Sequence, residues 1–188
     1  MQVVFLDLEM NQADNLEERI IEIGAVNVNL RTGEQKSFFN ELCNPEEKLV
    51  PFITKLTGIA QFQVDAAHNR SDVFARFWAW HQECGVRGVV YSWGDDGGLL
   101  ARQSVLLGVE VPKVNLVDFS QFFRWLRGAS QRPLGGGLKD SLKEVGMTFQ
   151  GTQHRALTDA ENTARLGVHL FGVLRKYYKL AKAFREPA

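Results

Sequence analysis

The 188-residue chain has few cysteines and no long apolar run. Two cysteines, Cys43 and Cys84, are too few for a disulfide framework and favour free thiols in a reducing, cytoplasmic compartment. No apolar segment approaches the roughly 20 residues that cross a bilayer. The first apolar segment already contains acidic residues, which is not the pattern of a signal peptide. We therefore expect a cytoplasmic protein without membrane contact.

The chain also lacks net charge, because 22 Lys and Arg balance 22 Asp and Glu. This balance argues against broad electrostatic binding of duplex nucleic acid. It does not exclude a nuclease, because bound metal ions bring positive charge to an acidic site. Repeats and linkers are lacking as well, so we predict one domain over residues 1–182 and a frayed tail at 183–188.

What the chain does contain is acidic residues at the ends of apolar segments. Asp7 and Glu9 follow the apolar run of residues 3–6, which is typical of a buried strand. Residues two apart on a strand point to the same face. Two neighbouring carboxylates at a buried position repel each other and lose hydration, and a divalent cation relieves both costs. The alternative is that both side chains simply face solvent at a strand end.

Two further segments add acidic residues and a histidine. Asp95 and Asp96 follow the apolar run of residues 89–91. Asp159 stands at the start of the best amphipathic helix of the sequence, with Thr158 as its expected N-cap. His154 precedes this helix on a polar, glycine-containing loop, and an imidazole changes its charge near neutral pH, as a general base requires. Alternatively, Asp159 is only a helix-start charge and His154 is a surface residue.

In this order the three segments resemble the motifs of the DEDDh 3′→5′ exonucleases, a group that includes proofreading exonucleases, oligoribonuclease and KapD-like exonucleases. Asp7-Leu8-Glu9 is similar to the first motif and Ser92-Trp93-Gly94-Asp95-Asp96 to the second. The segment from His154 to Asp159 matches the third, H-x₄-D, and residues 56–59 (LTGI) resemble a stretch between the first two motifs. The likeness extends from about residue 2 to about residue 178.

The sequence departs from the family pattern in two places. Met10 and Asn11 stand where many relatives have Thr-Gly, beside the expected position of the terminal nucleotide, and we interpret both as substrate-binding candidates. In the second motif, close relatives read W-G-x-aromatic-D, whereas here the aromatic residue before the aspartate is absent and two aspartates are adjacent. We favour Asp96 as the ligand because Leu99 and Leu100 then fall where the family's next helix has its apolar pair. Asp95 would be the N-cap or an adjacent acid.

The resemblance implies a two-metal phosphodiesterase. Asp7, Glu9, Asp96 and Asp159 would bind two Mg²⁺ or Mn²⁺ ions, and His154 would accept a proton from the attacking water. The implied products are nucleoside 5′-monophosphates, released from the 3′ ends of single-stranded DNA or RNA. Basic residues around a glycine-rich stretch either flank the path of the strand or form a solvated face; they are Arg124, Arg127, Arg132 and Lys139.

Hydrophobic periodicity predicts strands at about 2–8, 19–28, 35–42, 88–93 and 114–118. It predicts helices at about 72–84, 97–107, 119–127, 138–145 and 159–182, with Ser71 as the cap of the first. This order is typical of an α/β protein. The resemblance adds a ribonuclease H-like fold, with a mixed five-stranded sheet flanked by helices.

Two other function classes remain open from the sequence. One is a catalytically silent nucleic-acid-binding module on the same fold, for which the altered second motif is the only indication. The other is an unrelated metal-binding α/β protein in which the spacings are coincidental. Metal-dependent shortening of a labelled strand separates both of these classes from an exonuclease.

Overall fold

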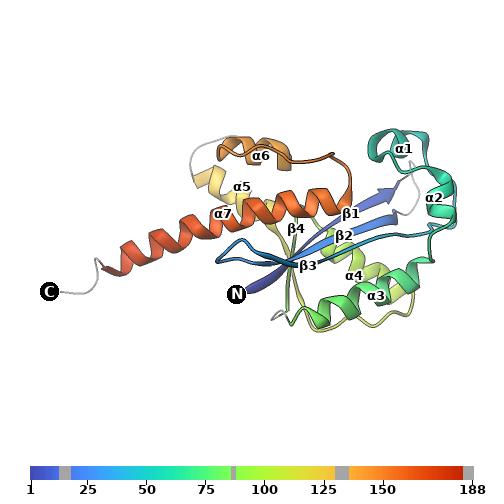
Figure 1. Ribbon diagram of the computed structural model, residues 1–188, viewed down its shortest axis with the longest axis horizontal. Helices are drawn as coiled ribbons and strands as arrows, with labels where there is room; N and C mark the ends of the chain where they lie inside the picture. Colours follow the sequence, from blue (N-terminus) through green and yellow to red (C-terminus); the bar gives the residue numbers. More distant parts are fainter. Residues whose placement is uncertain (13–17, 86–87, 130–135, 184–188) are drawn as a thin grey trace.

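A five-stranded mixed sheet forms the centre of the molecule (Figure 1). The structure, a computed structural model, describes residues 1–12, 18–85, 88–129 and 136–183. The strand order is β3-β2-β1-β4-β5, in which the β3–β2 and β2–β1 pairs are antiparallel and the β1–β4 and β4–β5 pairs are parallel. The predicted α/β architecture is therefore confirmed. The strands are β1 (Gln2–Asn11), β2 (Arg19–Asn29), β3 (Gln35–Leu42), β4 (Val89–Ser92) and β5 (Asn115–Asp118).

Helices cover both faces of this sheet. The described helices are α1 (Pro51–Thr57), α2 (Gln61–Asp65), α3 (Arg70–Glu83), α4 (Asp96–Leu106), α5 (Phe119–Ala129), α6 (Leu138–Glu144) and α7 (Ala156–Ala183). The sequence prediction missed α1 and α2, because helices this short show too little periodicity. None of the described helices combines the length and apolar composition that crossing a membrane requires.

Two predicted helix caps were wrong. Helix α3 begins earlier than expected, and Asn69 rather than Ser71 accepts the hydrogen bond from the Asp72 amide, at 2.8 Å. Helix α7 begins at Ala156, before Thr158, and its first amide donates to the Glu22 carboxylate on β2 at 3.0 Å. The acceptor for α7 comes from a distant strand, so local sequence rules could not identify it.

The two faces of β1 have different partners. Val4, Leu6 and Leu8 pack in one cluster with residues of α3 and α4, whereas Val3 and Phe5 pack in another with α7. Side chains alternate along a strand, so Asp7 and Glu9 continue the face toward α7. Figure 1 shows this division, with α3 and α4 on one side of the sheet and α5, α6 and α7 on the other.

Helix α7 lies very close to the sheet at two glycines. A Cβ atom on Gly24 of β2 would lie 2.0 Å from the Leu157 nitrogen, and one on Gly167 would lie 2.4 Å from a ring carbon of Phe5. A side chain at Gly24 would clash with the backbone of α7, and one at Gly167 would displace the Phe5 ring. Because Gly24 pairs with Asp7 across the β1–β2 ladder, this contact places the start of α7 beside the acidic end of β1.

Candidate active site

A cavity of about 420 Å³ gathers the acidic residues from all three sequence motifs. Strands β1 and β4 are parallel, and Leu6 pairs with Ser92. The carboxyl ends of the two strands therefore lie at the same edge of the sheet. The cavity is lined by Asp7, Leu8, Glu9, Trp93, Asp96, Gly137, Leu138, Lys139, Asp140, Phe149, Gln153, His154 and Asp159. The structure therefore brings together all five residues that the sequence predicted as catalytic.

Three of these side chains are close enough to share one ion. One ligand atom each from Glu9, His154 and Asp159 lies within 4.8 Å of the others. The donors are predominantly carboxylate oxygens, which suit hard divalent cations. The residues present therefore fit a divalent metal site.

The electrostatics of the carboxyl groups agree with such a site. Burial, followed by the charges of Asp96 and Asp159, raises the pKa of Asp7 well above its usual value. Burial and the charge of Asp159 raise the pKa of Glu9 to about 8, and burial with the charge of Asp118 raises that of Asp96 to about 7. Burial also raises the pKa of Asp159. Divalent cations would offset this dehydration and repulsion and favour the ionised groups.

The two adjacent aspartates of the second motif have different surroundings. The Asp95 side chain is 71% exposed and forms a 2.9 Å ion pair with Arg102, outside the cavity. It occupies the N-cap position of α4 without a side-chain capping bond. Asp96 lines the cavity, and the nearby backbone amide of Leu8 partly offsets the rise in the pKa of its carboxyl group. This geometry supports Asp96 as the ligand of the second motif.

His154 occupies an unusual backbone position. Its φ angle is 61°, in the left-handed region that few residues other than glycine adopt. Its backbone amide donates a 2.8 Å hydrogen bond to the Asp159 carboxylate, while its side chain lies at the exposed rim of the cavity. The aspartate thus fixes the position of the histidine.

Sequence reasoning missed Glu22, which holds the third motif in place. Glu22 pairs with Glu9 across the β1–β2 ladder and is 1% exposed. Its carboxylate accepts three hydrogen bonds from Arg155, the shortest at 2.6 Å, and one from the Ala156 amide. A signal was present, because an acid inside the apolar run of residues 20–23 needs a partner when it is buried.

The proposed substrate contacts Met10 and Asn11 do not line the cavity. Asn11 is 2% exposed, and its side-chain amide bonds to the Glu47 carboxylate, the Lys48 carbonyl and the Val50 amide. These bonds tie β1 to the segment before α1. Met10 packs partly buried against the core, so its contact with substrate stays a prediction.

The predicted basic cluster is divided. Arg127 is 6% exposed and its guanidinium pairs with Glu144 at 2.7 Å, so it is structural rather than strand-binding. Lys139 lines the cavity and bonds to Gln153 at 3.0 Å. Arg132 lies outside the described residues. Two aromatic side chains, Trp93 and Phe149, also line the cavity.

Comparison with known proteins assigns the family. The model of the exonuclease family (RNase_T) matches residues 4–166, most of the chain. The chain belongs to the exonuclease family. The predicted likeness to the DEDDh exonucleases is confirmed.

Residues 184–188 of the expected tail lie outside the described residues.

Curated relatives of this exonuclease domain are similar over most of the chain. ERI1 exoribonuclease 2 of Danio rerio is 31% identical over 173 residues, which is 79% of this chain and 30% of the relative. The 3′-5′ exonuclease Snipper of Drosophila melanogaster is 30% identical over 173 residues, or 80% of this chain and 60% of the relative. The chain thus covers less than two thirds of these relatives.

Solved structures confirm the ribonuclease H-like exonuclease fold. The nuclease domain of 3′hExo, a DEDDh family member determined with bound rAMP, superimposes with a TM-score of 0.79 at 22% identity, covering 91% of this chain and 92% of that one. Cell-death related nuclease 4 (CRN-4) gives the same TM-score of 0.79 at 16% identity, covering 92% of this chain and 64% of that one.

Proposed function

We propose that this chain is a metal-dependent 3′→5′ exonuclease that removes nucleoside 5′-monophosphates from single-stranded ends. The observation that carries the proposal is the convergence of Asp7, Glu9, Asp96, Asp159 and His154 on one cavity. Family membership over residues 4–166 and the names of the curated relatives support the same activity.

Each acidic residue has a proposed role in this reaction. Asp7, Glu9, Asp96 and Asp159 would hold two divalent ions, Mg²⁺ or Mn²⁺. Ions bound there would activate water and stabilise the developing charge on the phosphate and the departing 3′ oxygen. His154 would accept the proton of the attacking water through a neutral ring nitrogen. The bond between its amide and Asp159 would keep the imidazole at the rim of the cavity.

For the substrate we propose an RNA 3′ end in preference to DNA. The relatives that match over most of this chain include exoribonucleases. One structural neighbour recognises the 3′ end of a histone mRNA stem-loop, whereas another, exonuclease X, was determined with duplex DNA. Trp93 and Phe149 at the cavity would give a base an aromatic face, and such stacking contributes about 1–3 kcal/mol with any base.

The proposal is tested with matched RNA and DNA oligonucleotides that carry a 5′ label. Incubation with Mg²⁺ or Mn²⁺ should give a ladder that shortens stepwise from the 3′ end, faster for RNA, and EDTA should abolish it. His154→Asn tests the proposed role of the imidazole as proton acceptor. Asparagine tolerates the left-handed backbone of residue 154 but lacks the imidazole. Binding without shortening in the presence of metal would instead indicate a silent nucleic-acid-binding module.

A further inference from the structure

The second half of α7 projects away from the body of the molecule (Figure 1). Every residue from Val173 to Leu180 is exposed, whereas near the start of the helix Ala156, Ala160, Ala164 and Leu166 are buried. Tyr177 and Tyr178 are 69% and 75% exposed. A helix segment whose whole circumference is exposed makes few contacts that would stabilise it, so its side chains are available for a partner. We call residues 173–180 the arm.

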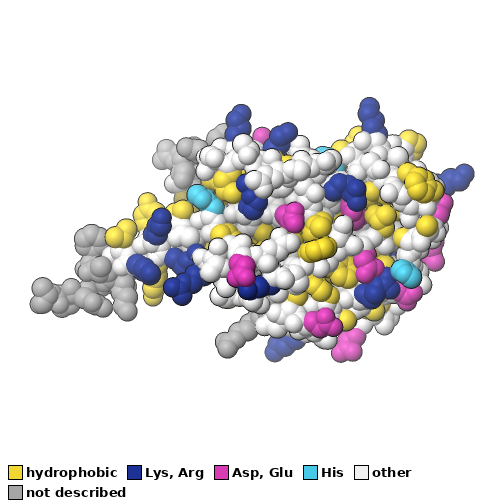
Figure 2. Space-filling view, viewed as in Figure 1, with side chains coloured by type: hydrophobic (Ala, Val, Ile, Leu, Met, Phe, Trp, Pro, Cys, Tyr) yellow, Lys and Arg dark blue, Asp and Glu magenta, His cyan; other side chains and the backbone are white. Residues whose placement is uncertain are grey.

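The arm belongs to a stretch that carries only positive charge. No Asp or Glu occurs between Asn162 and Ala183, although the chain as a whole is neutral. The basic residues of this stretch are Arg165, Arg175, Lys176, Lys179 and Lys182. At about 100° per residue, Arg165, Lys176 and Lys179 fall within one stripe of the helix. Figure 2 shows dark blue side chains gathered around the projecting end.

The two lysines of the arm, Lys176 and Lys179, make no polar side-chain contact with the described part of the chain. Among the residues that the structure describes, neither Lys176 nor Lys179 has a hydrogen-bond or ion-pair partner. The arginines differ, because Arg175 bonds to the Leu30 carbonyl at 3.0 Å and Arg165 to the Thr148 carbonyl at 3.0 Å. The two arginines anchor the helix, and the two lysines offer free charge.

We propose that the arm binds the phosphate backbone of a nucleic acid strand whose 3′ end lies in the acidic cavity. This inference rests on the proposed function and extends it to a second contact point. Charge selects the occupant: a polyanion complements a helix segment without acids, whereas the same arm of a second copy would repel it. The exposed tyrosines add aromatic faces on which unpaired bases stack.

The position of the arm agrees with a continuous strand. Lys176 and Lys179 follow Asp159 by 17 and 20 residues on the same helix, which at 1.5 Å per residue is about 26–30 Å. A stacked strand covers that distance with about 8–9 nucleotides, at 3.4 Å for each.

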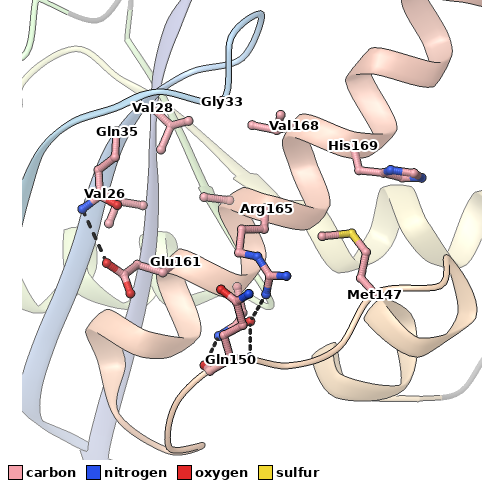
Figure 3. A pocket seen from close by; sticks show the side chains of 12 residues that line it. Val26, Val28, Gly33, Gln35, Met147, Gln150, Glu161, Arg165, Val168 and His169 are labelled. Atoms are coloured by element: carbon pink, nitrogen blue, oxygen red, sulfur yellow. Dashed lines mark hydrogen bonds between the residues drawn. The ribbon is translucent and has the colours of Figure 1, made fainter.

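Two grooves lie along α7 between the cavity and the end of the arm. The first, about 640 Å³, is lined by Arg165 and His169 of α7 and by residues of β2 and of the segment before α7 (Figure 3). Its one acid, Glu161, bonds to Gln35. The second, about 520 Å³, is lined by Tyr178 and Lys179 together with Arg31.

The test measures affinity as a function of strand length. Fluorescein-labelled oligouridylates of 5 and 20 nucleotides are titrated with the protein in EDTA, which prevents turnover. The 20-mer should bind at least tenfold more tightly than the 5-mer, and Lys176→Gln with Lys179→Gln should remove most of that difference. For the single-stranded 20-mer, loss of two phosphate contacts should reduce the slope of log K against log salt concentration by about 1.4. The affinity of the double variant for the 5-mer should differ from that of the wild type by less than twofold.

Lys113→Gln is the control for the lysine substitutions, because Lys113 is an exposed lysine outside α7. It should leave both affinities unchanged. Equal affinity of the 5-mer and the 20-mer, or an unchanged 20-mer affinity in the double variant, overturns the proposal. Two other results would also overturn it. One is a wild-type dimer, detected by light scattering, that the double variant no longer forms. The other is arm-dependent binding to anionic lipid vesicles that is tighter than binding to the 20-mer.

Activity on the 5-mer separates this inference from the proposed function. If Mg²⁺-dependent shortening of the 5-mer is intact in the wild type and in the double variant, and only the 20-mer advantage is lost, both proposals stand. If the 5-mer and the 20-mer are shortened equally well by both proteins, the arm proposal fails and the exonuclease assignment stands. If the wild type shortens neither strand but binds the 20-mer through the lysines, the exonuclease proposal fails and the arm remains a binding surface.

Discussion

The two ends of helix α7 differ in packing and charge. At its start, Glu22 accepts the Ala156 amide, Gly24 allows close contact with β2, and Asp159 faces an acidic cavity. At the other end, residues 173–180 are exposed on all sides and carry basic side chains. The first half is therefore positioned by tertiary contacts and the second half by helix propensity. One element thus combines a rigid end at the proposed active site with an exposed end, the proposed binding arm.

The largest expected effect lies in the acidic cavity that the start of α7 faces. Asp96→Asn should lower the exonuclease rate by about 10³-fold or more, because metal stabilisation of the transition state is worth several kcal/mol. Asp95→Asn, which removes an exposed ion pair with Arg102 and leaves the cavity lining intact, should stay within about threefold. Rates are measured on a labelled single strand at saturating Mg²⁺. An equal loss in both variants would contradict the assignment of Asp96.

Glu22→Gln tests the contact that holds α7 on β2. Removing one partner of a buried ion pair costs about 3–5 kcal/mol, and about 2–3 kcal/mol is expected here because the Arg155 side chain is 39% exposed. The rate should fall as well, since residues 154–159 lose their anchor. Urea unfolding and the exonuclease rate are measured together.

The control for this variant is Glu34→Gln, which breaks the exposed pair with Lys36 and should cost less than about 1 kcal/mol. If Glu22→Gln and Glu34→Gln destabilise the protein equally, the ion pair with Arg155 is not what positions the third motif.

Much of this site could be predicted from the sequence, because its residues follow apolar strands or precede an amphipathic helix. Strand alternation placed Asp7 and Glu9 on one face, and the H-x₄-D spacing located His154 and Asp159. The sequence did not predict the role of Glu22, because its partners, Arg155 and Ala156, are more than 130 residues away in sequence. The short helices α1 and α2 escaped because their periodicity extends over too few residues.

The functional difference within α7 also could not be read from its pattern. The apolar stripe continues from Ala160 to Tyr178, so periodicity predicts one uniform packed helix. Only the structure reveals that the sheet ends before the helix does, which leaves Leu174 and Tyr178 at 38% and 75% exposure. Burial depends on what lies opposite a helix, and a single sequence segment does not contain that information.

Addition of divalent metal should stabilise the fold around the acidic cavity, and the gain should depend on pH. Without metal, the pKa values of Glu9 and Asp96, about 8 and about 7, exceed those of the unfolded chain. The folded state then binds more protons, so these groups add stability below about pH 4 that is lost as the pH rises through about 7 to 8. Divalent ions bind the ionised carboxylates, so Mg²⁺ or Mn²⁺ should raise Tm more at pH 8 than at pH 6.

Thermal melts in EDTA and in excess metal measure this effect, and a few degrees are expected, since 1 kcal/mol shifts Tm by about 2–4 °C in a chain of this size. Glu9→Gln should flatten the pH dependence in EDTA and reduce the gain from metal. A metal effect of the same size at both pH values would show that the raised pKa values do not govern binding.

The smallest predicted effect compares two glycines of α7. Replacing Gly167 by alanine would bring a methyl group to within 2.4 Å of the Phe5 ring, whereas at Gly172 the nearest atom lies 3.8 Å away, in the flexible Arg175 side chain. Overpacking at Gly167 should cost about 1–3 kcal/mol, minus a propensity gain of about 1 kcal/mol. Gly172→Ala keeps the gain alone and should stabilise the protein by up to about 1 kcal/mol. Urea midpoints and helix content by circular dichroism should therefore move in opposite directions for the two variants, and movement in the same direction would mean that both halves of α7 are equally packed.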